Sequence, residues 1–460
     1  MIRRIGLINN SDMRYIEECE MHIVGHKIFV RMKDIPMYLS KKTKDSIRNR
    51  YSHSVEVGLS TEYLLRHVSR ELGEGIDLNF FKLAKIIGMV HDIGHTAFSH
   101  DGEMILDRML YEASQTLDKS IRFNANLNNF RRIEKYALFD ILPSDIKRYA
   151  LASLVKRKKE LKEYPEYASL KEDVAYAIAL EKKYLSSKGI EIENRNNKTI
   201  LCQAMDLADE NRYRVTDIID ALNIYSKEKL REVLIRSIKS EVPLKDIRKL
   251  VSLKTKYINQ RENSHSDKMK IKDLLVMLLE QESHAKTEFQ NVMNSLSMAF
   301  NRNFILSKEG KLVPLNEEIE RLRNDFHHIA ATYLWGSKKI KNIKKPFKHY
   351  FSTVADYFIN HTYNKDLIDS ATYKNALRQL EQKKMPSKER RYEQLLLLRN
   401  FLGGLTNLKI IELYKRIKLE EFETTYDYTI RKVDKLVHKT SMPEFEKKLE
   451  KYRQKSGGKL

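Results

Sequence analysis

The chain has 460 residues and is 42% hydrophobic, so it can bury a substantial core, and wholesale disorder is excluded. Only 15 glycines and 8 prolines interrupt a composition rich in helix formers, which favours an all-α protein. The two cysteines, Cys19 and Cys202, fit neither a disulfide framework nor a zinc spacing. No signal-peptide core or run of about 20 apolar residues is present. We therefore expect a soluble, cytoplasmic protein that does not use a membrane.

The positive charge is concentrated in the second half of the sequence. The formal net charge is +22, and residues 251–460 carry 41 basic and 26 acidic side chains, a net of +15. A field of this sign attracts polyanions such as nucleic acids or nucleotide triphosphates. Its densest run is Lys338–Lys348, which fits a polyanion site and a merely solvated, lysine-rich helical surface or loop equally well.

The spacing of apolar residues divides the sequence into three regions. Residues 1–45 are a mixed lead-in, residues 46–225 form a central core, and residues 226–460 form a basic helical region. Within the core, the first helical pattern starts after residue 49, with Ser52 as the candidate cap.

The second helix of the core carries an adjacent histidine and aspartate at its end. Apolar residues recur on one side of residues 80–91, and the pattern stops near Gly94, so that His91 and Asp92 fall in the last turn. An imidazole beside a carboxylate suits a divalent metal used in phosphate chemistry, although a lone histidine in this position is more often a core residue. We expect a third helix over residues 102–113.

A later helix, predicted over residues 199–224, aligns two acids and a phenol. Asp209, Tyr213 and Asp217 recur at four-residue steps, which places them on one helix face. A surface helix more often pairs an acid with a lysine or arginine at that step. The face is therefore either a solvated acidic stripe, or it supplies one carboxylate to a metal and lines a pocket with the rest.

The order His53, His91-Asp92, Asp209 resembles that of the HD-domain phosphohydrolases, and the surrounding segments resemble their deoxynucleoside triphosphate triphosphohydrolase (dGTPase-like) branch. The matching segments are RNRYSHSVEV (48–57), HDIGHTAFSHDGE (91–103), FNANLNNFR (123–131), ADENRYRVTDIIDA (208–221) and FLGGLTNLKIIELY (401–414). The resemblance implies that residues 46–225 are a catalytic HD-domain core and that residues 226–460 contribute to the pocket, to assembly and to regulation.

The resemblance also implies an activity and a set of roles. The activity is metal-dependent hydrolysis of dNTPs, including dGTP, to deoxynucleoside and inorganic triphosphate, with Mg²⁺ or Mn²⁺, or alternatively Fe, Co or Zn. The implied partners are further copies of the chain, commonly in a hexamer, and a single-stranded DNA or nucleotide effector. The implied residues are the metal ligands His53, His91, Asp92 and Asp209, the catalytic pair His100 and Glu103, the phosphate contacts Arg50 and His95, the substrate neighbour Asn126, and the sugar contacts Tyr213 and Asp217.

Two positions depart from the family pattern. Glu210 stands where a second aspartate is usual, and Asn407 stands where an acid is common. Two other functions stay open: another HD-domain phosphohydrolase, acting on nucleoside monophosphates or signalling nucleotides, and a non-catalytic protein that senses nucleotides or nucleic acid. The complete ligand set, together with His100 and Glu103, favours an enzyme.

Overall fold

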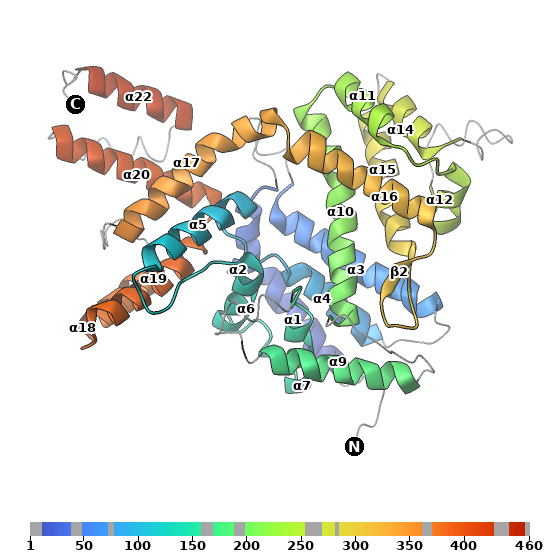
Figure 1. The fold of residues 1–460 in the computed structure, drawn as a ribbon, viewed down its shortest axis with the longest axis horizontal. Helices are drawn as coiled ribbons and strands as arrows, with labels where there is room; N and C mark the ends of the chain where they lie inside the picture. Colours follow the sequence, from blue (N-terminus) through green and yellow to red (C-terminus); the bar gives the residue numbers. More distant parts are fainter. Residues whose placement is uncertain are drawn as a thin grey trace. The chain divides into compact units, whose positions relative to one another are not determined.

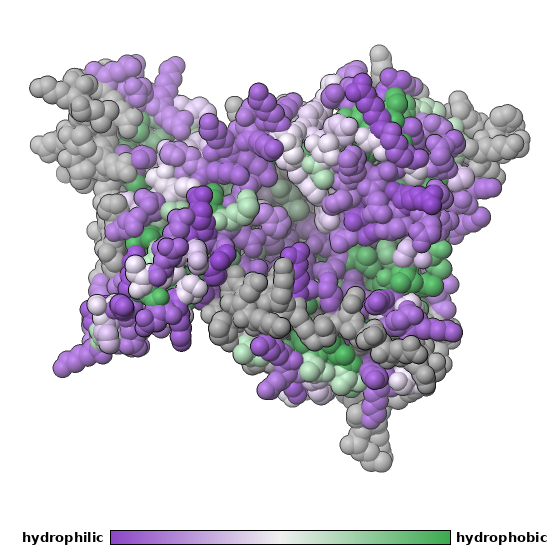
Figure 2. Space-filling model, viewed as in Figure 1, coloured by the Kyte–Doolittle hydropathy of each residue, from purple (hydrophilic) through white to green (hydrophobic). Residues whose placement is uncertain are grey.

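The protein is almost entirely helical. The computed structural model describes residues 12–37, 48–71, 78–157, 168, 170–187, 198–253, 269–280, 285–360, 370–426 and 441–455. Apart from one two-stranded antiparallel ribbon, the regular structure of these residues is helical (Figure 1), which confirms the expected all-α fold. The face drawn in Figure 2 is mostly hydrophilic, with hydrophobic residues in small separate patches. None of the described helices is long and apolar enough to cross a membrane.

Two compact units, each built from segments distant in the sequence, make up the structure. The first comprises the described parts of Met1–Lys33, Met37–Ile93 and Asn129–Asn342. Its elements are α1 (Met13–Gly25), α2 (Lys27–Val30), α3 (Arg50–Glu71), α4 (Leu78–Val90), α7 (Ser144–Ala152), α9 (Leu170–Ser187), α10 (Ile200–Ile224), α11 (Lys227–Ser237), α12 (Leu244–Leu250), α14 (Ile271–Glu280), α15 (Ala285–Arg302), β1 (Phe304–Leu306), β2 (Leu312–Pro314), α16 (Glu317–Ile329) and the π-helical turn Ala330–Trp335.

The second unit comprises the described parts of Asp34–Pro36, Gly94–Asn128 and Ile343–Leu460. It contains α5 (Ser99–Ser114), α18 (Ala371–Gln382), α19 (Ser387–Leu402), α20 (Asn407–Tyr426) and α22 (Met442–Lys455). The boundary between the units falls within α6 (Ala125–Lys135) and α17 (Lys338–Asn360), and a short 3₁₀ turn covers Arg31–Asp34. The three-region division expected from the sequence stays a prediction.

Helix α10 is central to the first unit. The Thr199 hydroxyl begins the helix by accepting a hydrogen bond from the Cys202 N–H at 3.0 Å, as an N-cap does. Ala204, Met205 and Ala208 are fully buried on the helix, which packs against α3, α4, α15 and α16. The predicted helix over residues 199–224 is therefore confirmed, and its contacts fix the side chains that it carries toward α3 and α4.

Helices α3 and α4 touch through a pair of glycines. A Cβ added to Gly58 would lie 2.6 Å from Met89 Cγ and 2.7 Å from the Lys85 carbonyl oxygen, and one added to Gly88 would lie 2.7 Å from the Gly58 Cα. Only glycine allows two backbones to approach this closely. The contact sets the spacing between His53, on the first turns of α3, and His91, in the turn directly after α4.

Two sequence-based expectations about these elements were wrong, and one alternative that the sequence left open is ruled out. The cap of α3 is Asn49, whose side-chain oxygen accepts a hydrogen bond from the Ser52 N–H at 2.9 Å, so Ser52 lies inside the helix. Helix α5 begins at Ser99 and includes Gly102, because the chain turns sharply at Phe98 and can start the helix earlier. The Lys338–Lys348 run is not a loop but the start of α17, which continues through Pro346 and buries Ile340 and Phe351.

The glycine contact yields a stability prediction. Gly58→Ala should lower the free energy of unfolding by about 1–3 kcal/mol, because backbone atoms of α4 stand in the way of the new methyl group. Urea denaturation would measure the change. Gly25→Ala is a matched control, since nothing lies within 4 Å of the Cβ that it adds. Equal stability of the two variants would contradict the claim that the helices are held this closely.

Candidate functional site

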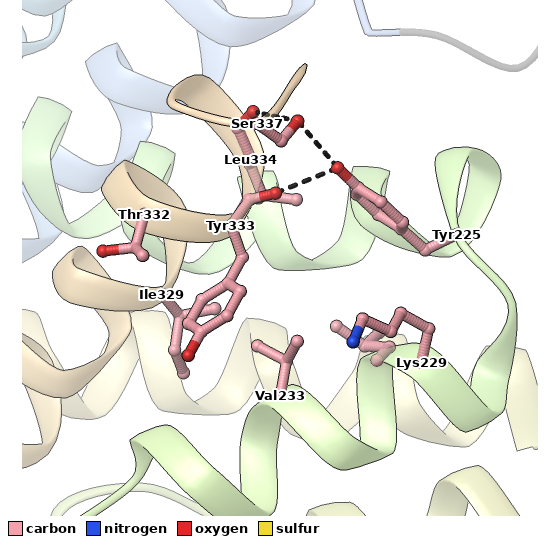
Figure 3. Close-up of a pocket in the computed structure, with 9 residues that line it drawn as sticks. Tyr225, Lys229, Val233, Ile329, Thr332, Tyr333, Leu334 and Ser337 are labelled. Carbon is pink, nitrogen blue, oxygen red and sulfur yellow. Dashed lines mark hydrogen bonds between the residues drawn. The ribbon is translucent and has the colours of Figure 1, made fainter. Parts of the chain in front are cut away.

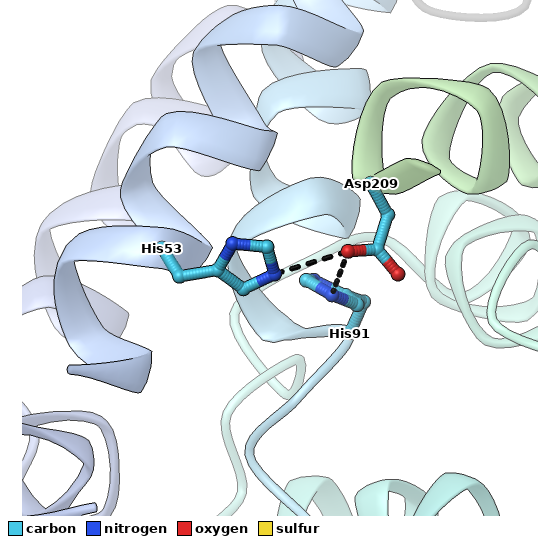
Figure 4. A group of neighbouring side chains, drawn as sticks. All are labelled: His53, His91 and Asp209. Carbon is cyan, nitrogen blue, oxygen red and sulfur yellow. Dashed lines mark hydrogen bonds and ion pairs between the residues drawn. The ribbon is translucent and has the colours of Figure 1, made fainter. Parts of the chain in front are cut away.

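A cluster of two buried histidines and a half-buried aspartate forms where α3, the turn after α4 and α10 meet (Figure 4). His53 Nε2 lies 3.0 Å from Asp209 Oδ1, and His91 Nε2 lies 3.6 Å from the same oxygen. One ligand atom from each of the three residues lies within 4.8 Å of the others, which is close enough for them to hold a metal ion. The structure thus brings together three of the four predicted metal ligands.

The backbone of α4 fixes the His91 ring in a form that suits a metal ligand. His91 Nδ1 lies 2.6 Å from the Gly88 carbonyl oxygen, which can only accept, so Nδ1 carries the hydrogen. The lone pair of a neutral ring is then on Nε2, which is buried and makes no hydrogen bond. A backbone carbonyl in this position commonly orients metal-binding histidines.

The fourth predicted ligand, Asp92, stands beside the cluster. Its Oδ1 is 3.4 Å from His91 Nε2, and its Oδ2 is 3.9 Å from His53 Nε2. The Oδ2 atom also forms an ion pair with Arg50, which is 4% exposed. Arg50, predicted to contact phosphate, therefore lies at the cluster and holds one of its carboxylates.

The electrostatics of the cluster favour a bound cation. Burial acts to raise the pKa of Asp209, but His91 and Lys156 lower it well below its usual range. Burial lowers the pKa of His53; for His91, the carboxylates of Asp92 and Asp209 outweigh burial and raise the pKa. The carboxylates of Asp92, which is buried, and of Asp209, which is half-buried, thus lie beside the imidazoles. A donor set of two nitrogens and two carboxylates fits a divalent ion.

Lys156 is a neighbour of the cluster that sequence reasoning missed. Its Nζ lies 3.4 Å from Asp209 Oδ2 and 3.6 Å from Asp206 Oδ1. Burial acts to lower the pKa of Lys156, but both aspartates raise it, so the ammonium group stays charged. Lys156 follows α7 in an ordinary loop, and nothing in its local sequence marks it.

A second cluster lies in the second unit, on the segment that continues from Asp92. His100 Nδ1 is 3.2 Å from Glu103 Oε2, and Glu103 Oε1 accepts a hydrogen bond from the Ala125 N–H at 2.7 Å. The His95 ring packs edge-on against His100, with 5.0 Å between ring centroids. Ligand atoms of the three also lie within 4.8 Å of one another.

The geometry of this second cluster suits proton transfer. Burial acts to raise the pKa of Glu103, but the hydrogen bond from His100 and the other contacts lower it, so the carboxylate stays ionised. An ionised Glu103 holds His100 in the form that carries the hydrogen on Nδ1. His100 is exposed, with its Nε2 available to a proton donor or acceptor, and Asn126 follows Ala125 on α6.

The far end of the α10 face forms a polar and aromatic wall in the first unit. Trp335 Nε1 donates a hydrogen bond to Asp217 Oδ2 at 2.9 Å, and the Trp335 ring lies 5.7 Å from that of Tyr213. Arg48 lies 3.7 Å from Asp217 Oδ1 and binds Asp220 at 3.1 Å. Trp335 and Arg48 therefore lie beside Tyr213 and Asp217, the two residues predicted to contact the sugar.

Glu210, the departure from the paired aspartates, has a packing role. Its Oε2 accepts from Arg214 at 3.0 Å and from Arg323 at 2.7 Å, and Arg323 is 4% exposed. Arg323 also donates to Asn211 Oδ1 at 2.7 Å. The longer glutamate thus ties α10 to the buried arginine of α16, rather than adding a carboxylate to the cluster.

A separate cavity of about 180 Å³ opens beside the π-helical turn (Figure 3). Its walls are mostly apolar, with the side chains of Tyr225 and Tyr333 among them and Lys229 pointing into the opening. The Tyr225 hydroxyl lies 2.9 Å from the Tyr333 carbonyl oxygen and 2.8 Å from Ser337 Oγ. None of the predicted site residues, all of which lie in the described ranges, lines this cavity.

Curated proteins similar to the chain share one description. A deoxyguanosinetriphosphate triphosphohydrolase-like protein 2 of Mesorhizobium japonicum is 25% identical over 227 residues, 44% of each chain. A similarly named protein of Clostridium tetani is 30% identical over 133 residues, 29% of this chain and 33% of its own. The resemblance to the dGTPase-like family is confirmed.

The similarity to these relatives covers only part of each sequence. A third relative, deoxyguanosinetriphosphate triphosphohydrolase-like protein 1 of Mesorhizobium japonicum, is 30% identical over 205 residues, 44% of this chain and 45% of its own. The chain thus matches less than half the length of these dGTPase-like relatives. No family model matches the chain. The printed names of these relatives are those of triphosphohydrolases, and two groups of histidine and acidic side chains among the described residues of this chain could hold a metal.

Proposed function

We propose that the protein hydrolyses deoxynucleoside triphosphates to deoxynucleoside and inorganic triphosphate, using a divalent ion held by His53, His91, Asp92 and Asp209. The observation that carries the proposal is the convergence of His53 Nε2, His91 Nε2 and Asp209 Oδ1 in a buried, acid-rich cluster. The dGTPase-like names of the relatives support the choice of substrate.

The ion is Mg²⁺ or Mn²⁺, with Fe, Co and Zn as alternatives that the same donors accept. When bound, it supplies Lewis-acid stabilisation of the negative charge that develops on the reacting phosphoryl group. Arg50 and His95 contribute positive charge and hydrogen-bond donors to the phosphate oxygens. A guanidinium group suits this role because it stays charged and can bind two oxygens at once.

In the reaction, a water oxygen bonds to the α-phosphorus, the bond between phosphorus and O5′ breaks, and a proton ends on O5′. His100 moves this proton, and Glu103 orients the ring through the 3.2 Å contact with Nδ1. Tyr213 and Asp217 contact the deoxyribose, Asp217 at the 3′-hydroxyl, and Asn126 contacts the substrate close to the catalytic pair.

The proposal extends to assembly and control in the cytoplasm. The protein forms a homo-oligomer, commonly a hexamer, with a nucleotide or single-stranded DNA effector. The resemblance to the dGTPase-like family supports the homo-oligomer, and the surplus of positive charge beyond residue 250 supports a polyanionic effector. Exposed lysines on α17, including Lys338, Lys341 and Lys345, form a surface suited to a polyanion.

The metal site can be tested by substitution. His91→Ala and Asp209→Ala should each lose both bound Mn²⁺ and release of deoxynucleoside from dGTP, because each removes a ligand from the buried cluster. Metal content and product chromatography measure the two losses. Asp206→Asn is the control, since Asp206 lies on the same helix but pairs with Lys198 at 2.5 Å and with Lys156 at 3.6 Å rather than with the two histidines. Variants that keep both the ion and turnover would remove the central claim.

The catalytic pair makes a kinetic prediction. His100→Ala should lower kcat by about 10²–10⁴-fold and leave KM nearly unchanged, because proton transfer contributes in the transition state. Steady-state kinetics with dGTP gives both constants. A rise in KM with unchanged kcat would make His100 a binding residue instead.

The sugar contacts predict selectivity. dGTP should be hydrolysed in preference to GTP, and a 3′-deoxy analogue should lose about 1–3 kcal/mol of transition-state binding, because Asp217 then loses a donor. Comparison of kcat/KM for the three nucleotides measures this. Equal values for GTP and dGTP would contradict the sugar assignment and leave the metal site standing.

A further inference from the structure

The catalytic pair sits on a helix that starts from strained backbone. Phe98 and Ser99, directly before His100, have φ values of 60° and 56°, in the left-handed region that residues with a Cβ rarely adopt. Gly102 fits against this turn only because it lacks a Cβ, which would lie 1.9 Å from the Ala97 carbonyl oxygen. Such backbone persists only where its surroundings hold it in place.

Contacts from later parts of the second unit hold this turn. The Phe98 N–H donates to Asn407 Oδ1 at 2.8 Å, and the Thr96 hydroxyl donates to the Leu402 carbonyl at 3.0 Å. Asn407 thus anchors the turn in place of the acid expected there. The Phe98 ring packs against Phe347 of α17, with 5.3 Å between centroids.

An ion triad fastens the first turn of α5 to the same face of α17. Asp101 is 8% exposed, and its two carboxylate oxygens each meet a lysine at 2.9 Å, Oδ1 from Lys348 and Oδ2 from Lys344. Burial acts to raise the pKa of Asp101, but the hydrogen bonds from both lysines lower it, so the carboxylate stays charged.

Asp101 lies between His100 and Glu103 in the sequence but on a different side of the helix. His100 and Glu103 share a face at a three-residue step, and Asp101 is rotated by about 100° from His100. Asp101 can therefore fix the rotation of this turn without facing the substrate. The His100 ring depends on that rotation, because it is exposed and its Nδ1 bonds to Glu103 one helical turn along.

We propose that Asp101, held by Lys344 and Lys348, is a positioning residue that sets the geometry of the His100–Glu103 pair. The inference rests on the proposed function and adds to it a role for part of the basic run. Two of its six lysines serve the catalytic turn, and the other four, Lys338, Lys339, Lys341 and Lys345, are exposed on the same helix. Loss of the triad lets the strained turn relax and moves His100 away from its productive position.

Kinetics of charge variants tests this role. Asp101→Asn, and separately the double variant Lys344→Met with Lys348→Met, should lower kcat for dGTP by about 10- to 100-fold, as misplacement of a catalytic group does, with KM changed less than about twofold. Asp101→Glu should restore part of kcat. The matched control is Lys447→Met with Lys451→Met, which removes two exposed lysines at the same spacing on α22.

The thermal midpoint of every variant separates positioning from loss of folded protein. A kcat for Asp101→Asn equal to that of the lysine control would overturn the proposal, as would a loss explained by the unfolded fraction alone.

The NMR signal of the His100 Cε1–H group, identified by its absence in His100→Gln, gives a readout without turnover. It should shift in Asp101→Asn and in Lys344→Met with Lys348→Met, but not in the control. Wild-type protein that hydrolyses no dNTP would remove the proposed function, and the NMR shift would still decide the positioning role. An unchanged His100 signal in both test variants would overturn it.

Discussion

The close contact between Gly58 of α3 and Gly88 of α4 is the constraint on which the site depends. It sets the distance at which α3 presents His53 and the turn after α4 presents His91, while α10 packs against both helices and supplies Asp209. Gly88 has a second role, because its carbonyl oxygen accepts the hydrogen bond that leaves His91 Nε2 free to bind a metal. Gly88 therefore both allows the close packing of α3 against α4 and orients the His91 ring, although it has no side chain.

The charges around the cluster follow from that packing. A buried carboxylate is unfavourable unless a cation stands beside it. Lys156 forms an ion pair with Asp209, and Arg50 forms one with Asp92. Both carboxylates also lie beside the two imidazoles. The cluster therefore offers two carboxylates and two ring nitrogens as donors at one point. A divalent ion satisfies such a set, and the same ion suits a substrate that carries several negative charges.

The sequence predicted the helical fold and the cluster well, because both depend on local pattern. The His91-Asp92 pair at the end of one helix and Asp209 on the face of another were visible from spacing, and the structure brings them together. Their roles as metal ligands stay a prediction. Asn49 was missed as a cap because Ser52 also has a capping side chain, and only the hydrogen bond distinguishes them.

The remaining residues could not be found from local pattern because their partners are distant in the sequence. Trp335 meets Asp217 across 118 positions, and Lys156 meets Asp209 across 53. The sequence left open whether the basic run Lys338–Lys348 is a polyanion site, a solvated helical surface or a loop, because its lysines and Pro346 suggest exposure. The structure shows a helix, α17, that buries Ile340 and Phe351 on one side. Charge pairing with Asp101 is a tertiary property that composition does not reveal.

Anomalous diffraction from crystals grown with Mn²⁺ tests the central claim most directly, because it locates the ion independently of activity. The account predicts one strong peak, about 2.0–2.3 Å from His53 Nε2, His91 Nε2 and an Asp209 carboxylate oxygen. A peak confined to His95, His100 and Glu103, or no peak at either group, would contradict it.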